Sequence, residues 1–394
     1  MENNELLYWL ALRSASGIGN VTFKSLLGFF PSPYHVFQAT YPELLRIPGI
    51  GPKTASAIKG FHQWQKLENE LKELNKFHIH LVTLHDREYP GILKNIFDYP
   101  PLLYVKGTLE EGDLNIAMVG SRMASTYGVY TTERLARELA MNGMTIVSGM
   151  ARGIDSAAHR GALAGRGRTI AVLGCGLDVI YPPENKDLYK NISENGAVIS
   201  EYAPGTPPNA PNFPMRNRII SGLSLGVVVV EANERSGSLI TARIAMEQGR
   251  EVFAVPGSID FHGSRGSHRL IKEGAKLIEN VDDVLEEILP QIRRTRRELL
   301  PGEKKGSTDL REMRQPDQET SVSHPSSERS FSEHETMILN LLASGTVDID
   351  TIIAKSGLSV NETMNCLLNL ELYDAILQLP GKLYKRKETP CPIP

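Results

Sequence analysis

The sequence predicts an α/β protein built on an extended, Rossmann-type doubly wound parallel sheet, with an N-terminal helical domain and a C-terminal winged-helix-like domain. Three observations predict this class. Residues 113–290 alternate short Val- and Ile-rich runs with amphipathic stretches, as the strands and helices of a covered parallel sheet do. Residues 1–80 show only helical spacing of apolar side chains. Residues 331–387 fit three helices followed by a hairpin.

The composition indicates a multidomain globular protein. The chain has 394 residues, 41% hydrophobic and 23% charged, which is enough apolar material for more than one core. Its three cysteines are far apart and odd in number, which excludes a disulfide framework and a cysteine-based zinc site. We find neither a secretory signal nor a membrane-spanning run, so we expect a cytoplasmic protein without membrane contact. Because the formal charge is −3, an anionic partner must be held by a local basic patch.

The first domain, residues 1–80, is expected to be helical and SAM- or helix-hairpin-helix-like. Its first helices are expected at Asn4–Leu12 and Val21–Phe29. Further on, Ile47–Ile58 places a Gly-x-Gly turn before a helix rich in small residues, a pattern that can direct backbone N–H groups at a DNA phosphate. The same pattern also occurs in packing modules. We favour packing, because only Lys53 and Lys59 supply positive charge nearby.

The second domain, residues 81–290, begins with a connector and continues as alternating strands and helices. The connector carries two short extended pieces, His80–Leu84 and Leu102–Val105. The strands are expected at Asn115–Val119, Met144–Val147, Thr169–Leu173, Ala197–Ser200, Gly226–Val230, Glu251–Val255 and Lys276–Ile278. The helices are expected at Thr126–Met141, Ile154–Ala164, Asn185–Glu194, Met215–Gly222 and Ser238–Gln248. Such short apolar strands are typical of a parallel sheet that is buried on both faces.

The rest of the chain predicts a flexible linker at 291–330 and a winged-helix-like domain at 331–394. The linker contains the cluster Arg293–Arg297, which we interpret as solvated rather than as a nucleic-acid contact. The elements expected in the last domain are helices Ser332–Ala343, Asp348–Lys355 and Val360–Glu371 and a hairpin of Ala375–Leu379 and Leu383–Lys387. The third helix carries glutamates and no Lys or Arg, so contact with a protein is favoured over contact with DNA.

The loops that follow the strands are the candidate site, because an open parallel sheet binds ligands beyond the carboxyl ends of its strands. These loops share Gly, Ser and Arg. Glycines permit close approach, N–H groups and Ser hydroxyls hydrogen-bond phosphate oxygens, and Arg adds a bidentate charge. The arginines expected at this edge are Arg122, Arg152, Arg216, Arg218 and Arg235. The sequence therefore predicts an anion-binding edge that suits phosphates.

No catalytic or metal-binding constellation is predicted at this edge. The G-x-G-x-x-G pattern after the third strand is incomplete, and there is no P-loop motif. His159 and Asp155, four residues apart, lack a third ligand, so His159 is interpreted as a packing residue and we expect no metal or other cofactor. Glu201 and Glu231 end two strands and could act as an acid and a base. We favour instead a role in orienting nearby arginines or backbone donors.

The motifs at the strand ends resemble those of a bacterial family, the DNA-processing protein A or DprA/Smf family. The resemblance covers about residues 85–290. It is carried by VGSR at 119–122, SGMARGIDSAAH at 148–159, AVLGCG at 171–176 with Tyr181–Pro182, NFPMRNRIIS at 212–221, EANERSGSLIT at 231–241 and GREVFAVPG at 249–257. Together these motifs are highly specific, and the flanking domains also resemble those of longer family members.

The resemblance implies a non-catalytic protein that binds and protects incoming single-stranded DNA, forms a homodimer and loads the RecA recombinase during natural transformation. It places the phosphate pocket of the family on Gly120, Ser121 and Arg122. The other residues expected to bind DNA are Gly149, Arg152, Lys186, Phe213, Arg216, Asn217, Arg218, Ser236, Gly237 and Ser238. Lys186 is expected to replace a basic residue that some members have where this chain has Pro183.

A row of Arg side chains and backbone N–H donors suits a phosphodiester backbone and makes no base-specific hydrogen bonds. We therefore expect DNA binding that is largely independent of sequence. Phe213 and Tyr181 are expected either to stack on bases or to pack their loops, and the sequence does not separate these roles.

Two alternative functions stay open. Related Rossmann proteins hydrolyse the phosphoribosyl bonds of nucleotides, and a Gly-rich loop with a nearby glutamate resembles theirs. In this chain Glu231 and Glu234 lie upstream of the loop Ser236–Thr241, which lacks an acid where such an enzyme would place one. The other alternative is a protein adaptor that works through residues 331–387.

Overall fold

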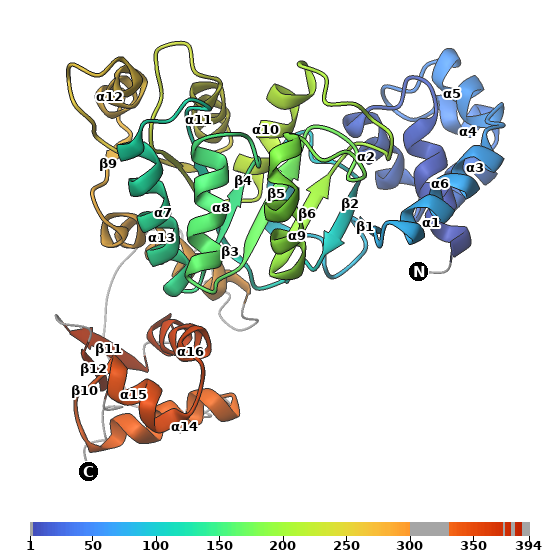
Figure 1. Ribbon diagram of the computed structural model, residues 1–394. Coiled ribbons are helices and arrows are strands. Elements are labelled where there is room, and N and C mark those ends of the chain that lie inside the picture. Colours follow the sequence, from blue (N-terminus) through green and yellow to red (C-terminus); the bar gives the residue numbers. More distant parts are fainter. Residues whose placement is uncertain (1–2, 300–330, 373–374, 380–382, 388–394) are drawn as a thin grey trace, which may run out of the picture. The chain divides into compact units, whose positions relative to one another are not determined.

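The computed structural model describes residues 3–299, 331–372, 375–379 and 383–387 (Figure 1). The chain divides into two units, Met1–Ile288 and Leu289–Pro394. Residues 300–330, which make up most of the predicted linker, lie outside the described part. Within the described ranges, no helix combines the length and the apolar character that crossing a membrane requires.

The described part of the N-terminal domain contains six helices around an aromatic core. They are α1 (Asn3–Ser14), α2 (Asn20–Phe29), α3 (Pro33–Gln38), α4 (Tyr41–Leu45), α5 (Pro52–Lys59) and α6 (Trp64–Lys76). Trp9 is fully buried and stacks on Phe23, with ring centroids 5.4 Å apart. The two helices predicted first, now α1 and α2, are confirmed to within two residues at each end.

Helices α4 and α5 form the predicted helix-hairpin-helix. Gly49, in the turn between them, has φ +86°, a conformation that glycine adopts without strain. Lys59 is exposed, but its Nζ donates to the carbonyls of Phe37 (3.0 Å) and Ala39 (2.8 Å) at the end of α3. Lys59 therefore stabilises the packing of α3 on α5, whereas the exposed Lys53 makes no such contact within the described residues, and this supports the packing interpretation.

The centre of the first unit is one large sheet. Its described strands are β1 (His80–Thr83), β2 (Leu102–Gly107), β3 (Leu114–Val119), β4 (Met144–Ser148), β5 (Thr169–Leu173), β6 (Gly196–Ser200), β7 (Gly226–Val229), β8 (Glu251–Ala254) and β9 (Lys276–Leu277). Their order is β1-β2-β6-β5-β4-β3-β7-β8-β9. Strands β3 to β9 run parallel to one another, whereas β2 pairs antiparallel with both β1 and β6. Every predicted strand is present, and β4, β5 and β6 are buried along their whole length.

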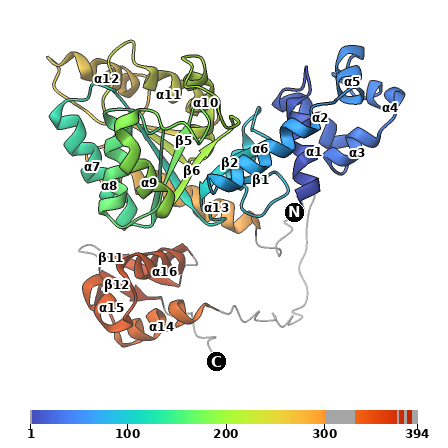
Figure 2. The same ribbon diagram turned by 45° about the vertical axis from the view of Figure 1, so that its right-hand side comes forward.

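Helices cover both faces of this sheet (Figures 1 and 2). They are α7 (Thr126–Met141), α8 (Ile154–Ala164), α9 (Lys186–Glu194), α10 (Asn212–Gly222), α11 (Gly237–Glu247), α12 (Arg265–Lys272) and α13 (Val281–Leu299). Short 3₁₀ turns are formed by Gly91–Asn95, Pro183–Asn185 and His262–Ser264. Helices α7, α8 and α9 pack side by side on one face, and α10 packs against α11 on the other. This is the predicted doubly wound arrangement.

Two helix boundaries differ from those predicted. Helix α10 begins at Asn212 rather than at Met215, so the NFPMRNR motif lies on a helix and not in a loop. Helix α13 continues through Pro290 to Leu299, so the linker predicted from residue 291 begins too early. Asp282 and Asp283 in the first turn of α13 complement the dipole at the start of the helix.

The N-terminal domain is joined to the β2 side of the sheet by polar contacts. Arg13 on α1 donates to the hydroxyl of Tyr104 (3.0 Å) and to the carbonyl of Glu201. Tyr104 in turn donates to Glu70 on α6 (2.6 Å). Asn20 donates to the carbonyl of Asp98 (3.0 Å). These contacts fix the helical domain against β2, the segment before it and the residue that follows β6.

The second unit is a small three-helix domain with an antiparallel sheet. Its elements are α14 (Glu333–Leu341), the 3₁₀ turn Leu342–Ser344, β10 (Val347–Asp348), α15 (Ile349–Ser356), α16 (Val360–Leu372), β11 (Ile376–Leu379) and β12 (Leu383–Arg386). The strand order is β10-β12-β11, with both pairs antiparallel. Ile338, Leu367 and Leu370 are buried in its core. The predicted helices and hairpin strands are confirmed; the turn at 380–382 lies outside the described residues.

Candidate nucleic-acid interface

The candidate site lies at the topological switch point of the sheet. From β3 the chain crosses to β4 on one side, and β7 lies on the other side of β3. Both strands run parallel, so the loops after β3 and β7 leave the sheet at the same edge. This edge carries Gly120, Ser121 and Arg122 after β3 and Arg235 to Ser238 after β7.

The loop after β3 is held by close backbone contacts. Ser121 N donates to the carbonyl of Glu231 (2.7 Å), and Ile154 N donates to the carbonyl of Ser121 (3.1 Å). Gly153 has φ +74°, and a Cβ there would lie only 2.2 Å from the Ser121 carbonyl oxygen. A Cβ on Gly120 would lie 2.6 Å from Ile154. Both glycines are therefore required for the loop to lie against the start of α8, which fixes where Arg122 leaves the loop.

Arg122, Phe213 and Tyr181 come together at this edge. The Arg122 guanidinium carbon lies 5.3 Å from the centre of the Phe213 ring, a cation–π distance. Phe213 is tilted by 41° against Tyr181, with ring centroids 5.7 Å apart. Arg122 is exposed and pairs with no carboxylate in the described part of the chain, while both rings are half-buried. Two loops and the first turn of α10 thus place an exposed cation beside two aromatic rings.

Arg216 does not face this edge, contrary to the prediction. Its side chain is 3% exposed and donates to the carbonyls of Gly149 (2.9 Å) and Val172. A Cβ on Gly149 would lie 2.4 Å from the guanidinium, so this glycine makes room for Arg216 rather than for a ligand. Burial lowers the pKa of Arg216 to about 10, and the side chain stays charged at neutral pH. Arg216 and Gly149 are therefore internal supports of the edge.

Arg218 is also buried, at 6% exposure, which corrects its assignment as a phosphate ligand. It forms ion pairs with Glu201 and, at 3.0 Å, with Asp98. The interpretation of Glu201 as a residue that orients an arginine is confirmed. Both errors have one cause: the motif lies on α10, whose buried side carries Arg216 and Arg218, whereas Asn217 between them is half-buried.

Arg152 and Lys186 are exposed, as predicted. Arg152 forms an ion pair with Glu184, in which Nη2 lies 3.0 Å from Oε2. Because both side chains are about half-exposed, this pair is weak and a phosphate can compete for the guanidinium. Lys186 begins α9 and pairs with no acid among the described residues. The sequence analysis missed Glu184, which lies in the 3₁₀ turn just before α9.

The loop after β7 forms the start of helix α11. Ser236 is its N-cap and accepts a hydrogen bond from Ser238 N, and the two hydroxyls lie 2.7 Å apart. Gly237 is exposed, whereas Ser238 is buried. Glu231, at 3% exposure, accepts hydrogen bonds from Ser125 N (3.1 Å) and Ser125 Oγ (2.5 Å). The interpretation of Glu231 as an acid that orients backbone donors is confirmed.

His159 is a buried packing residue, as predicted. Its Nδ1 lies 2.7 Å from the Thr169 hydroxyl, which itself donates to the carbonyl of Ile146. Burial lowers the pKa of His159 to about 3, so the ring is neutral. Burial also raises the pKa of Asp155, while the charge of Arg216 opposes this. Among the residues that the structure describes, no cluster of His, Cys, Asp and Glu could hold a metal ion.

The sequence analysis missed three exposed apolar side chains beside Arg122. Met123 is 91% exposed, Tyr127 is 56% exposed and Tyr130 is 65% exposed. The two tyrosines are three residues apart on the first turns of α7 and therefore share a face. Large exposed apolar side chains that follow a cationic loop are the signal that could have revealed them. The Tyr127 hydroxyl donates to the carbonyl of Pro256 (3.2 Å), which follows β8.

The fold and this edge define the class: a Rossmann-type protein with Gly- and Arg-bearing loops at its switch point, preceded by a helix-hairpin-helix and followed by a winged helix. Family comparisons agree with each part. The model of DNA recombination-mediator protein A matches residues 80–289, the DprA winged helix domain matches 322–382, and the helix-hairpin-helix motif matches 35–61. The chain belongs to the DNA recombination-mediator protein A family, DprA/Smf.

Individual relatives match over most of the chain. Protein Smf of Synechocystis sp. is 35% identical, over 98% of this chain and 100% of that protein. DNA processing protein DprA of Streptococcus pneumoniae is 50% identical, over 55% of this chain and 76% of that protein. The X-ray structure of DNA processing protein A from Streptococcus pneumoniae superposes with a TM-score of 0.63 and 40% identity, over 72% of this chain and 98% of that chain.

Proposed function

We propose that this chain binds single-stranded DNA at the switch-point edge and passes it to the RecA recombinase during natural transformation. The observation that carries this proposal is Arg122, an exposed guanidinium that pairs with no carboxylate among the described residues and lies beside the rings of Phe213 and Tyr181. A fixed cation and exposed rings suit the phosphates and the unstacked bases of a single strand. The names of the relatives, DNA processing protein and recombination mediator, support the same substrate.

The proposed interface is smaller and more aromatic than the one predicted. It keeps Gly120, Ser121 and Arg122, with the exposed Arg152, Lys186 and Gly237 and the half-buried Ser236 as further phosphate contacts; Ser238 is buried and supports the cap of α11. Met123, Tyr127 and Tyr130 are added as surfaces on which bases can stack. No member of this set reads a base edge through a fixed pattern of donors and acceptors, so binding is expected to be independent of sequence.

The proposed role is binding without catalysis. The two acids best suited to acid–base chemistry, Glu201 and Glu231, are buried in contacts with Arg218 and Ser125. A phosphoribohydrolase-like enzyme would need one of them free to reach a substrate. If the protein released base from nucleoside monophosphates, the non-catalytic part of the proposal would be wrong.

The test of the proposal is a fluorescence titration with labelled oligo-dT, a mixed-sequence single strand and a duplex of the same length. We expect similar affinity for the two single strands and much weaker binding of the duplex, whose bases cannot reach the rings. A preference for the duplex, or no binding of either strand, would contradict it. The loading step is tested on the same oligonucleotide coated with single-strand-binding protein. The measurement is the rate at which RecA replaces that protein with and without this chain.

The proposal also includes a cytoplasmic homodimer. Cys175 and Cys366 are free and buried, as a reducing compartment permits. Two linked edges would hold one long strand more tightly than a single edge, because the second contact is intramolecular. Light scattering in the concentration range of DNA binding checks the dimer, and a monomer throughout that range would remove it.

A further inference from the structure

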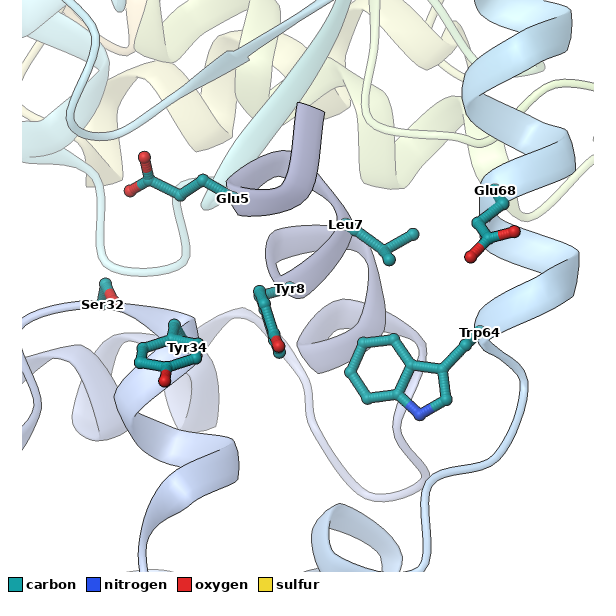
Figure 3. Close-up of a pocket in the computed structure, with 7 residues that line it drawn as sticks. All are labelled: Glu5, Leu7, Tyr8, Ser32, Tyr34, Trp64 and Glu68. Atoms are coloured by element: carbon teal, nitrogen blue, oxygen red, sulfur yellow. The ribbon is translucent and has the colours of Figure 1, made fainter. Parts of the chain in front are cut away.

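The N-terminal domain contains an open pocket that the proposed DNA site does not use. Its volume is about 670 Å³. Figure 3 shows the residues that line it: Glu5, Leu7, Tyr8, Ser32, Tyr34, Trp64 and Glu68. They come from α1, α6 and the chain around the start of α3. The pocket is therefore formed where three segments of the helical domain meet.

Three of the seven residues that line this pocket are aromatic. Tyr8 lies between Tyr34 and Trp64, at centroid distances of 5.1 Å and 5.4 Å (Figure 3). The indole N–H of Trp64 donates to the carbonyl of Phe61 (3.2 Å), so the polar group of this ring is already satisfied within the domain. Tyr34 is 43% exposed. The three rings thus offer apolar surface to a ligand, and the hydroxyls of Tyr8 and Tyr34 add polar groups at its rim.

Two carboxylates flank these rings. In Figure 3, Glu5 lies on the side of Tyr34 and Glu68 on the side of Trp64. Glu68 accepts a hydrogen bond from Gln65 (3.1 Å), and neither glutamate forms an ion pair within the described part of the chain. No lysine or arginine lines the pocket. The site therefore combines negative charge with aromatic faces, which attracts cations and repels the phosphates of DNA.

We propose that this pocket binds a basic segment of a partner protein, with arginine or lysine side chains lying on the Tyr8, Tyr34 and Trp64 rings and pairing with Glu5 and Glu68. Arginine suits both features, since its planar guanidinium stacks on rings and forms bidentate bonds with carboxylates. Because the two glutamates stand at opposite sides of the rings, the pocket takes a segment with more than one cation. This assignment is independent of the DNA site, which lies at the sheet edge.

The test is a titration of the full chain with a short labelled peptide of alternating Arg and Gly, with a Glu and Gly peptide of the same length as the reference. Of the two tryptophans, Trp9 is fully buried, so a change in tryptophan emission reports on Trp64. We expect the Arg peptide to bind and to change this emission, and the Glu peptide to do neither. Oligo-dT should not displace the Arg peptide.

Two variants locate the peptide. The double substitution Glu5→Gln and Glu68→Gln should weaken binding about fivefold to tenfold, the combined effect of two solvent-exposed ion pairs. The control is Glu111→Gln with Glu247→Gln, which changes the net charge equally at exposed positions of the sheet domain and should leave binding unchanged. Tyr34→Ala should weaken binding about threefold, whereas Tyr34→Phe keeps the ring and the affinity.

The proposal is overturned if the pocket and control double variants bind the Arg peptide equally, or if oligo-dT competes with it. It is also overturned if arginine amide binds as tightly as the peptide, since the pocket would then select a single small cation. If the Glu5→Gln, Glu68→Gln variant also loses oligo-dT binding, the whole first unit is disturbed and this variant is not informative. The comparison of Tyr34→Phe with Tyr34→Ala then decides whether the Tyr34 ring binds the peptide.

Discussion

Five arginines that look alike in the sequence do different things in the structure. Arg122 and Arg235 are exposed, Arg152 is exposed and paired, and Arg216 and Arg218 are buried. Residue type and position after a strand led to the expectation of an exposed side chain, which holds for the first three, and their contact with DNA stays a prediction. Residue type and position could not predict the other two, because burial of a charge depends on partners that lie far away in the chain. For Arg218 these partners are Asp98 and Glu201.

The substitution Arg218→Ala should therefore impair folding rather than binding alone. It leaves Glu201 buried without its cation, and breaking a buried ion pair typically costs about 3–5 kcal/mol. Urea unfolding followed by circular dichroism measures the loss. Arg243→Ala, at an exposed position of α11, is the matched control and should change stability by less than about 0.5 kcal/mol. Equal stability of the two variants would contradict the buried role of Arg218.

The neutral His159 predicts a dependence of stability on pH. Its pKa is about 3 in the folded protein and 6.5 in the unfolded chain. Between these pH values the unfolded chain binds a proton that the folded protein does not. The contribution of the neutral His159 to the free energy of unfolding is therefore complete above pH 6.5 and is lost as the pH falls. The free energy of unfolding then falls by about 1.4 kcal/mol for each pH unit. For His159→Gln, the free energy of unfolding measured from pH 7 to pH 4 should change less with pH than that of the native chain, by about this amount per pH unit. An unchanged slope would mean that His159 titrates normally.

At the scale of elements, the apolar pattern predicted the sheet and most of its helices. Helices α7 and α8 and strand β5 have the predicted bounds, because each is a continuous apolar or amphipathic run between clear turn signals. The start of α10 was missed because Pro214 suggested a loop. Proline is tolerated in the first turn of a helix, where its missing N–H is not needed. The antiparallel addition of β1 and β2 to the sheet could not be predicted, since strand order depends on packing.

The contact between the β3 loop and α8 should depend on Gly153. The substitution Gly153→Ala brings a Cβ within 2.2 Å of the Ser121 carbonyl at φ +74°, so the loop must move. We expect a destabilisation of about 2 kcal/mol or more, together with weaker oligo-dT binding, because Arg122 is displaced. Gly112→Ala is the control, since a Cβ there meets nothing within 4 Å. Gly153→Ala with native stability and native oligo-dT affinity would refute this role of the glycine.

At the scale of the whole molecule, the structure divides the chain into two units, Met1–Ile288 and Leu289–Pro394, so the bounds 1–80 and 81–290 stay predictions. The function of each part is less visible in the sequence. The helix-hairpin-helix has a lysine that packs, and the aromatic pocket beside it is acidic rather than basic. The apolar periodicity that predicts such a helical domain does not predict which of its aromatic side chains stay exposed to solvent. Domain order is therefore predictable here, and the partner of each domain is not.

The winged-helix domain should contribute little to DNA affinity. Helix α16 carries Glu362 and Glu371 and no Lys or Arg, which suits a protein surface better than a DNA groove. Removal of residues 331–394 is expected to change the affinity for oligo-dT by no more than about twofold, since distant and independent sites contribute additively. A large loss of affinity, measured by the same fluorescence titration, would place part of the DNA site in this domain.

The central claim is that the exposed cation of the β3 loop neutralises a phosphate of a single strand. The most direct measurement is the affinity of the native chain and of Arg122→Ala for labelled oligo-dT over a series of salt concentrations. Losing one phosphate contact should weaken binding at every salt concentration and make the log–log salt slope shallower by about 0.7. If the variant binds with the affinity and the salt slope of the native chain, the strand lies elsewhere and the claim is contradicted.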